Sequence, residues 1–403
     1  MSTKPAFKGE QGVLRYPDGR SVNCSFRLWV DERRGVQLQC RHPQPGWVHG
    51  EREGTGPHLF EAVEPDGTQL VLSGALFAIA VRSQRHDLAL VTYDYNGPGL
   101  QLTNDSAQST RLTVRFRLFN LRFSGNVSTQ SALPDGGYRL GRDTLSLSLQ
   151  GRALSIVQLD KYDAITRRLT SKQEECAVTC EALCSVEEPA GLVECEAWMD
   201  LVCSLLSLAA GTKVSWASYK AFNVDNSLAR QVHRAAVLGR FSSASLLSLD
   251  DPQSLRSYLE SAATQANAPG QFLELRKAID AKMDAQVGGY LETRALMASV
   301  LAEYLASAYA ASRRRTCRSF GERLQFVARE LRLPFRGKDI QKLNNTRDSL
   351  AHELRFRTDN RRAEYWRVMH FVDCVLLRSL GFSGHYISRE TRQLQSLPPL
   401  TTS

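Results

Sequence analysis

Apolar and polar residues alternate along several segments in the first half of the chain. The clearest examples cover residues 22–30, 112–118 and 145–149. Successive side chains of a β-strand point to opposite faces, so this two-residue period, with one face polar, predicts half-buried antiparallel strands. Three Pro-Asp-Gly sequences favour tight turns between such strands. We therefore expect residues 10–160 to form a β-sandwich or barrel-like module.

A mixed region follows. Leu192–Leu208 carries apolar residues on one helical face, and Gly211 stands where such a helix would end. Val214–Phe222 and Ala229–Leu238 are predicted to pair as a hairpin, although the second segment would also serve as a helix.

From Asp251 onward the apolar period lengthens to that of a helix. Asp251 and Pro252 suit the N-cap and first position of the first helix. The further predicted helices are Phe272–Val287, Tyr290–Ser312, Phe320–Leu331, Lys338–Phe356 and Ala363–Leu380. Their short connections predict an all-α bundle with antiparallel neighbours.

The two patterns together predict an α+β multidomain protein. Residues 1–245 would form an N-terminal domain, an antiparallel β-rich sandwich or barrel-like fold with a sensor or regulatory role. Residues 246–395 would form the all-α helical bundle, and residues 396–403 a flexible tail.

Charge is distributed unevenly along the chain. Its 403 residues are 42% apolar and 23% charged, which is ordinary for a globular protein, and the formal net charge is +9. Between Arg313 and Arg378 there are 17 Lys and Arg and 8 Asp and Glu, so this stretch carries an excess of nine and the rest is near neutral. Such concentration indicates an anionic partner, with nucleic acid first, although solvated helix faces would give the same count.

The number of cysteines and the hydropathy of the chain indicate the cellular compartment of the protein. No secretion signal is visible, and no apolar run reaches the roughly 18 to 20 residues that a membrane span needs. With nine cysteines, an odd number, we expect reduced thiols and a cytoplasmic protein without membrane contact.

One cluster of cysteines is a candidate metal site. Cys176, Cys180 and Cys184 have zinc-ligand spacing, and Cys195 is a candidate fourth ligand. Because the first three share one side of a predicted strand, a buried thiol stripe is favoured, and the sequence leaves metal binding there open. The chain has no glycine-rich nucleotide-binding motif, so we expect no cofactor.

The most informative string is Asn344–Glu353, on the penultimate predicted helix. Arg347 and His352 are five positions apart, about 7.5 Å of rise and roughly 140° of rotation on an α-helix, so the long arginine can still reach a phosphate beside the imidazole. Histidine can take the 2′-hydroxyl proton of RNA, and arginine can stabilise a pentacoordinate phosphorus. RNA supplies its own nucleophile, so no metal is required. Such spacing is also common by chance, and both residues could be ordinary surface residues.

Around this string the sequence resembles the HEPN superfamily, whose RNases carry Arg-x4-6-His on a late helix of an all-α bundle. It is most similar to the Apea-like HEPN group of bacterial phage-defence proteins, over about residues 285–390. The likeness rests on Leu291–Arg294, which opens the long helix, and on Leu376–Ile387, which resembles the group's Leu-Gly-aromatic-x-Gly closing segment. Leu205–Gly211 and Val214–Trp216 resemble the β-rich domain that precedes the bundle in this group.

The resemblance implies a metal-independent endoribonuclease that acts as a homodimer across a basic cleft. Arg347 and His352 would be catalytic, with one His352 as base, its symmetry mate as acid, and a 2′,3′-cyclic phosphate product. The implied setting is a toxin or effector in antiviral defence or abortive infection, with a phage-derived trigger or an inhibitory partner at the N-terminal domain. Asp348 fills the polar position after the arginine, where asparagine is commoner, and Asn344 would help to hold the phosphate or cap a helix kink.

Four arginines follow the motif closely: Arg355, Arg357, Arg361 and Arg362. We predict that they bind RNA phosphates, although a solvated turn between two helices would also contain them.

Two other functions stay open. The bundle could be a catalytically silent dimerisation module or a module that binds RNA or a partner, which the intact Arg347 and His352 argue against. A polynucleotide-binding regulator built on the β-rich region is the third reading, and the near-neutral charge of that region argues against it.

Overall fold

In the computed structural model, the described residues are 5–15, 19, 21–31, 35–43, 57–64, 68–85, 88–96, 100–103, 111–132, 138–234, 239–266, 271–287 and 289–399. The chain divides into two compact units. The first comprises Met1–Leu118, Glu181–Glu196 and Trp216–Leu238, and the second comprises Phe119–Cys180, Ala197–Ser215 and Gly239–Ser403. The predicted domain boundaries at residues 245 and 395 stay predictions.

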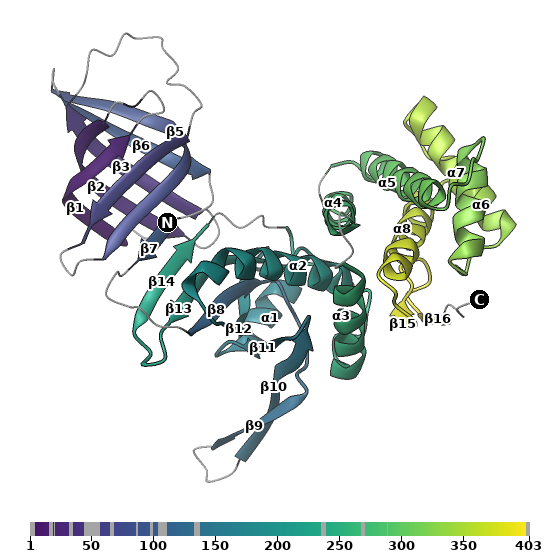
Figure 1. The fold of residues 1–403 in the computed structure, drawn as a ribbon. Coiled ribbons are helices and arrows are strands. Elements are labelled where there is room, and N and C mark those ends of the chain that lie inside the picture. The colour runs from purple at the N-terminus through teal and green to yellow at the C-terminus, as the bar shows by residue number, and fades with distance from the viewer. Residues whose placement is uncertain are drawn as a thin grey trace. The chain divides into compact units, whose positions relative to one another are not determined.

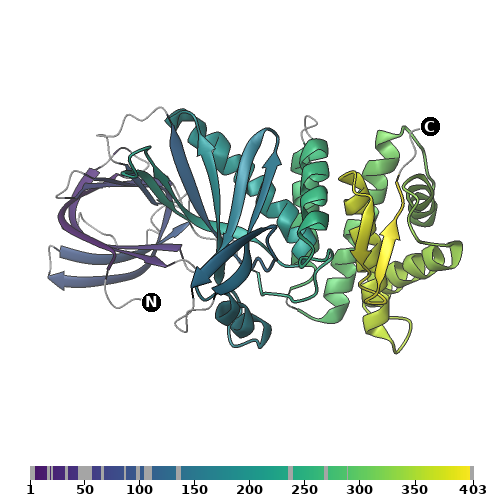
Figure 2. The ribbon, with the colours of Figure 1, turned by 90° about the horizontal axis from the view of Figure 1, so that it is seen from below.

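Six strands of the first unit close into an antiparallel barrel, which Figure 2 shows curving round on itself. The strands are β1 Phe7–Arg15, β2 Ser21–Asp31, β3 Gly35–Pro43, β4 Pro57–Val63, β5 Gln69–Arg85 and β6 Leu88–Asn96. Their hydrogen-bonded order is β4-β1-β2-β3-β6-β5, and β4 pairs again with β5, which closes the ring. All six pairings are antiparallel. The predicted antiparallel β-structure is therefore confirmed.

Alternate side chains of the barrel strands form its interior. In β2, Cys24, Phe26 and Leu28 are buried, whereas Arg27 between them is exposed. The Phe26 ring meets the ring of Phe60 on β4 edge to face, with centroids 5.0 Å apart. The alternation in the sequence therefore reflects burial of one strand face against the other strands of the ring.

The strand order of the first unit continues beyond the barrel. β5 pairs with β7 Leu100–Thr103, followed by β14 Leu228–His233, β13 Ser215–Phe222 and β8 Leu112–Phe119. β13 and β14 pair antiparallel, with Tyr219 opposite Val232. The predicted hairpin is thus confirmed, and its second segment is a strand. Of the three Pro-Asp-Gly turns, all but Gly19 lie outside the described residues.

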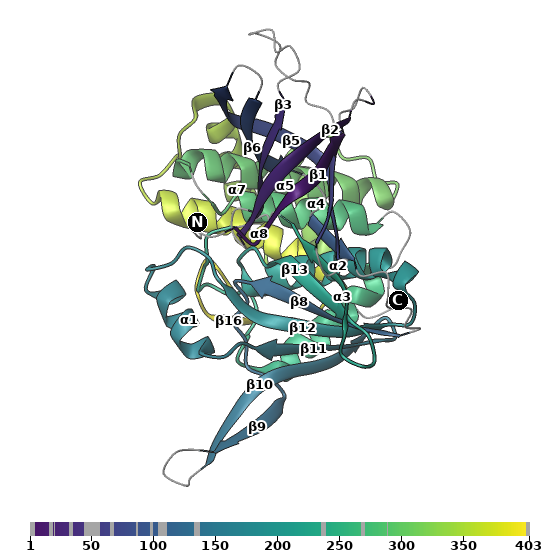
Figure 3. The same cartoon turned by 90° about the vertical axis from the view of Figure 1, so that its left-hand side faces the viewer.

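A smaller set of strands and two helices occupies the middle of the chain. The elements are β9 Val127–Ala132, β10 Tyr138–Leu149, β11 Arg152–Gln158, α1 Tyr162–Thr170, β12 Val178–Val186, the 3-10 turn Pro189–Gly191 and α2 Leu192–Ala210. The 3-10 turn belongs to the first unit, and β12 and α2 each have residues in both units. The strand order is β12-β11-β10-β9, and β9 and β10 form an antiparallel hairpin (Figure 3). The helix α1 was not anticipated. The predicted helix α2 ends at Gly211, whose φ of 65° is the left-handed conformation that favours glycine.

Six further helices follow: α3 Pro252–Ala266, α4 Gln271–Asp284, α5 Leu291–Ser312, α6 Phe320–Glu330, α7 Gly337–Glu353 and α8 Arg361–Ser379. α5 packs against α4, α6, α7 and α8 (Figure 1). In the described part, α5 alone is long and apolar enough to cross a membrane by length and composition, and 44% of its most apolar window is buried. A core helix passes the same test.

The expectation of a purely helical C-terminal region needs a correction. After α8, β15 Gly384–Ile387 pairs antiparallel with β16 Leu394–Leu397. Ser396 and Leu397 belong to the predicted flexible tail, yet both lie in β16 and Leu397 is buried. Two four-residue strands give little periodic signal, and they are held here because each satisfies the backbone groups of the other.

Candidate functional site

The helix α7 presents one face to the core and the other to solvent. At its start, the backbone N–H of Arg336 donates to the Asp339 carboxylate over 3.1 Å, and this acidic side chain suits the positive end of the helix dipole. Leu343 and Leu350 are buried on the core face. The helix ends three residues before the predicted end, because Leu354 adopts a left-handed φ of 51°.

Arg347 lies in an ion-pair network that joins α7 to α5 and α6. Its Nη2 is 3.1 Å from Oε2 of Glu303, and its Nη1 is 3.3 Å from Oδ1 of Asp348. The other oxygen of Glu303 accepts from Arg323 Nη2 over 2.9 Å. Asn344 Nδ2 donates to Oδ2 of Asp348 over 3.0 Å. The structure therefore brings the predicted residues Asn344, Arg347 and Asp348 together.

The charges of this network balance, since two arginines face two carboxylates. The exposed fractions of the Arg323, Glu303, Arg347 and Asp348 side chains range from 23% to 40%. The Arg347 guanidinium also lies 5.8 Å from the ring centroid of Phe320. Arg347 is thus held in one orientation by several partners while about a third of it stays in contact with water.

His352 is exposed in the last turn of α7. Among the described residues, no hydrogen bond or ion pair holds its imidazole. Neither Arg347 nor His352 is buried, so both can meet a ligand from solvent, although no contact joins them to each other.

The four predicted RNA-binding arginines are all exposed around the connection between α7 and α8: Arg355, Arg357, Arg361 and Arg362. Arg355 pairs with Glu353, and Arg361 Nη1 is 3.1 Å from Glu292 Oε1 on α5. Exposed ion pairs contribute little free energy, so these pairs would yield readily to a phosphate.

Sequence reasoning missed Glu303 and Arg323. Glu303 lies 44 residues before Arg347 in the chain, on a helix in which nothing distinguishes it from any other charged position. Only the packing of α5 and α6 beside α7 makes it the partner of the motif arginine.

A second polar cluster lies in the interior, away from the motif. Lys282 on α4 and Asp373 on α8 are fully buried, and Nζ is 3.2 Å from Oδ1. Arg389 Nε donates to the other oxygen of Asp373 over 2.8 Å. Burial lowers the pKa of Lys282 to about 8, despite the attraction of Asp373. One carboxylate thus faces two buried cations, so the cluster keeps one surplus positive charge.

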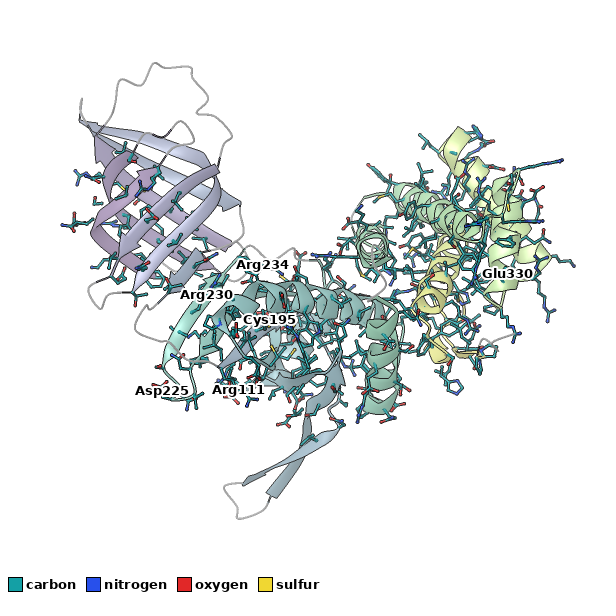
Figure 4. The ribbon with its side chains drawn as sticks, in the orientation of Figure 1. Arg111, Cys195, Asp225, Arg230, Arg234 and Glu330 are labelled. Atoms are coloured by element: carbon teal, nitrogen blue, oxygen red, sulfur yellow. The ribbon has the colours of Figure 1, made fainter. Side chains whose placement is uncertain are left out.

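The predicted thiol stripe is confirmed for two of its three cysteines, since Cys176 precedes β12 and is only half-buried. Cys180 and Cys184 are buried with Ala182 on one side of the strand. Cys184 Sγ is 3.4 Å from Sγ of Cys195 on α2, which Figure 4 labels. Within the described ranges, no three His, Cys, Asp or Glu side chains are grouped to hold a metal ion.

Comparison with protein-family models, curated proteins and solved structures found no match for this chain. The likeness to the HEPN superfamily therefore stays a prediction from the sequence motifs.

Proposed function

We propose that the protein is a metal-independent endoribonuclease whose catalytic groups are Arg347 and His352. The observation that carries the proposal is that both side chains reach solvent from one helix, with Arg347 anchored by Glu303 and Asp348 and His352 without a partner in the described part. An anchored guanidinium is organised in advance to bind phosphate, and an unpaired imidazole is able to accept or donate a proton.

In the proposed reaction, His352 of one copy takes the proton of the 2′-hydroxyl. The 2′-oxygen attacks phosphorus, and Arg347 stabilises the charge of the pentacoordinate phosphorane. The bond from phosphorus to the 5′-oxygen breaks, and His352 of a second copy gives that oxygen a proton. The products are a 2′,3′-cyclic phosphate and a 5′-hydroxyl, so atoms and protons balance without an added nucleophile.

A second copy of this chain is supported by the exposed face of α5. Met297, Val300 and Tyr304 are 41%, 58% and 40% exposed and follow one another at helical spacing. The opposite face, including Ala302 and Ala306, is buried in the helical core. A helix that is apolar on all sides is normally covered on all sides. An isologous dimer through α5 would cover this face, and Glu303 beside Tyr304 would bring the Arg347 network next to the interface.

The arginines around the connection between α7 and α8 would bind flanking phosphates of the RNA. A biological role in anti-phage defence or abortive infection is inferred from the motif resemblance alone. An activating or inhibitory partner of the β-barrel region is part of the same inference.

A catalytically silent module that binds RNA or a partner is the second candidate. The observation in its favour is the charge balance of the network, since Glu303 and Asp348 occupy the guanidinium that would otherwise meet the phosphate. The two functions differ in one outcome, which is cleavage.

The test is incubation of the purified full-length protein with mixed cellular RNA, with and without EDTA. His352→Ala and Arg347→Ala are compared with two matched controls. His385→Ala removes another exposed histidine, on β15. Arg323→Ala removes the second arginine of Glu303 and leaves Arg347 in place.

We expect cutting in EDTA by the parent and by His385→Ala, and none by the two motif variants. Arg323→Ala should keep most of the activity. Equal RNA retention by all proteins without any cutting would instead establish the binding module. Loss of cutting in both Arg323→Ala and Arg347→Ala would show that the network supports the fold rather than the phosphate.

A further inference from the structure

A cavity of about 570 Å³ opens in the second unit, away from the Arg347 and His352 positions. It is formed by the segment after α5, one face of α6 and the start of α7. Its volume lies within the range of small-molecule sites. The residues that matter for its chemistry are Arg315, Cys317, Phe326, Arg329, Arg332 and Phe335.

The wall of this cavity carries an excess of positive charge. Arg315, Arg329 and Arg332 line it against a single carboxylate, Glu322. Arg329 pairs with Glu330, labelled in Figure 4, over 3.3 Å, but the two side chains are 73% and 39% exposed, so this pair is weak. The cavity therefore favours an anion.

A buried cation near the wall adds to this charge. Arg378 on α8 is buried, and its Nε and Nη2 have no hydrogen-bond partner among the described residues. Burial and the nearby positive charge of Arg332 lower the pKa of Arg378. Arg378 does not line the cavity itself, but its charge lies near that of Arg332, which does.

The cavity also offers two aromatic rings. Phe335 is fixed from behind, with its ring centroid 5.1 Å from His370 and 5.2 Å from Phe371. The Arg329 guanidinium lies 5.9 Å from the ring centroid of Phe326. Both rings are half-buried, so part of each faces the cavity. Phenylalanine faces together with arginine planes are what proteins use to stack nucleobases.

We propose that this cavity binds one nucleotide unit, with its base against Phe326 and Phe335 and its phosphate at Arg315, Arg329 and Arg332. The unit is either part of a single-stranded RNA or a free nucleoside monophosphate, since the two present the same chemistry. As a holding site for the substrate strand, it rests on the proposed function. Its binding chemistry does not involve Arg347 or His352.

Binding is measured in the full-length His352→Ala protein, which keeps the RNA intact whether or not the parent cuts. The probe is a short fluorescein-labelled oligoadenylate, followed by anisotropy, with AMP and inorganic phosphate as competitors. Phe326→Leu removes the aromatic face and keeps an apolar side chain, and Arg329→Gln removes one charge. Arg313→Gln is the matched control, because Arg313 is an exposed arginine of the same run that does not line the cavity.

We expect Phe326→Leu and Arg329→Gln each to weaken RNA binding about tenfold and Arg313→Gln to leave it unchanged. If AMP displaces the labelled oligonucleotide, the cavity also binds free nucleoside monophosphates. If AMP does not displace it, the cavity binds only nucleotides of an RNA strand. The inference is overturned if the oligonucleotide does not bind, or if all three variants bind like the parent. It is also overturned if phosphate competes as well as AMP while Phe326→Leu has no effect.

A second measurement needs no substitution in the cavity. Cys317 lines it and is partly exposed, and Cys176 is partly exposed elsewhere. Saturating oligoadenylate should slow alkylation of Cys317 at least severalfold, as followed by mass spectrometry, and leave Cys176 unchanged. Equal rates at Cys317 with and without the oligonucleotide would overturn the site, even if the parent proves to be an active nuclease.

Discussion

The buried cluster of Lys282, Asp373 and Arg389 allows a sharp prediction about stability. Replacing Lys282 by Met keeps the length of the side chain and removes its charge. Replacing Asp373 by Asn keeps the shape and removes the only anion. The two variants break the same ion pair, yet we expect opposite results, because one removes a surplus cation and the other leaves two cations facing each other without a counter-charge.

The magnitudes follow from burial. The pKa of Lys282 falls from 10.5 to about 8, and at 1.36 kcal/mol per unit this is a penalty of roughly 3 kcal/mol for the charged lysine at neutral pH. Lys282→Met should therefore leave the free energy of unfolding unchanged or raise it by up to about that amount. Asp373→Asn should lower it by about 3 to 5 kcal/mol.

The two pKa values of Lys282 determine in which direction the stability changes with pH. Between the folded pKa of about 8 and the unfolded value of 10.5, the unfolded lysine keeps a proton that the folded one has released. The stability of the parent should rise with pH in this window relative to Lys282→Met, because the penalty for the charged lysine is complete below pH 8 and is absent above pH 10.5. Taking the difference between the two proteins cancels the other titrating groups.

The assay is urea unfolding of both variants at pH 7 and pH 9. Glu260→Gln, which breaks the exposed Arg256–Glu260 pair, is the control and should change the free energy of unfolding by less than about 1 kcal/mol. If Lys282→Met destabilises the protein as much as Asp373→Asn, or if its difference from the parent does not change with pH, the reasoning is refuted.

Other predictions follow from single contacts. Gly211→Ala should lower the free energy of unfolding by more than about 2 kcal/mol in urea, because φ is 65° and an added Cβ would lie 2.3 Å from a carbonyl oxygen; a smaller loss would contradict this. Burial lowers the pKa of His233 from 6.5 to about 4, so the unfolded chain binds a proton that the folded chain does not, and stability should decrease as the pH is lowered from 6.5 to 4. His233→Gln should flatten this fall, and identical pH profiles would argue against it. Glu303→Gln should raise RNA retention by the His352→Ala protein severalfold, since it removes the negative charge that faces Arg323 and Arg347; unchanged retention would count against the network. Val300→Glu should convert the proposed dimer into a monomer in analytical ultracentrifugation, and an unchanged mass would exclude α5 as the interface.

The sequence by itself determined the strands and helices with a clear hydrophobic period, but not α1, β15 or β16. The two-residue period of residues 22–30 and the helical period from Asp251 onward report which side of each element meets the interior, and local backbone geometry makes that readable without a partner. Gly211 as a helix end and the hairpin of β13 and β14 were readable for the same reason. The Arg347 and His352 pair was found because both residues lie on one helix, where spacing alone sets their separation.

The tertiary structure alone decided which elements meet. A hydrophobic pattern shows that one face of a strand is buried, but it does not show which element covers that face. The pairing of β4 with β5 that closes the barrel could therefore not be predicted from the sequence. Glu303 and Lys282 look like any other charged residues of a helix. The first became the partner of Arg347 and the second a buried cation only because distant helices pack beside them, and the energy of a charge depends on those neighbours and on the exclusion of water.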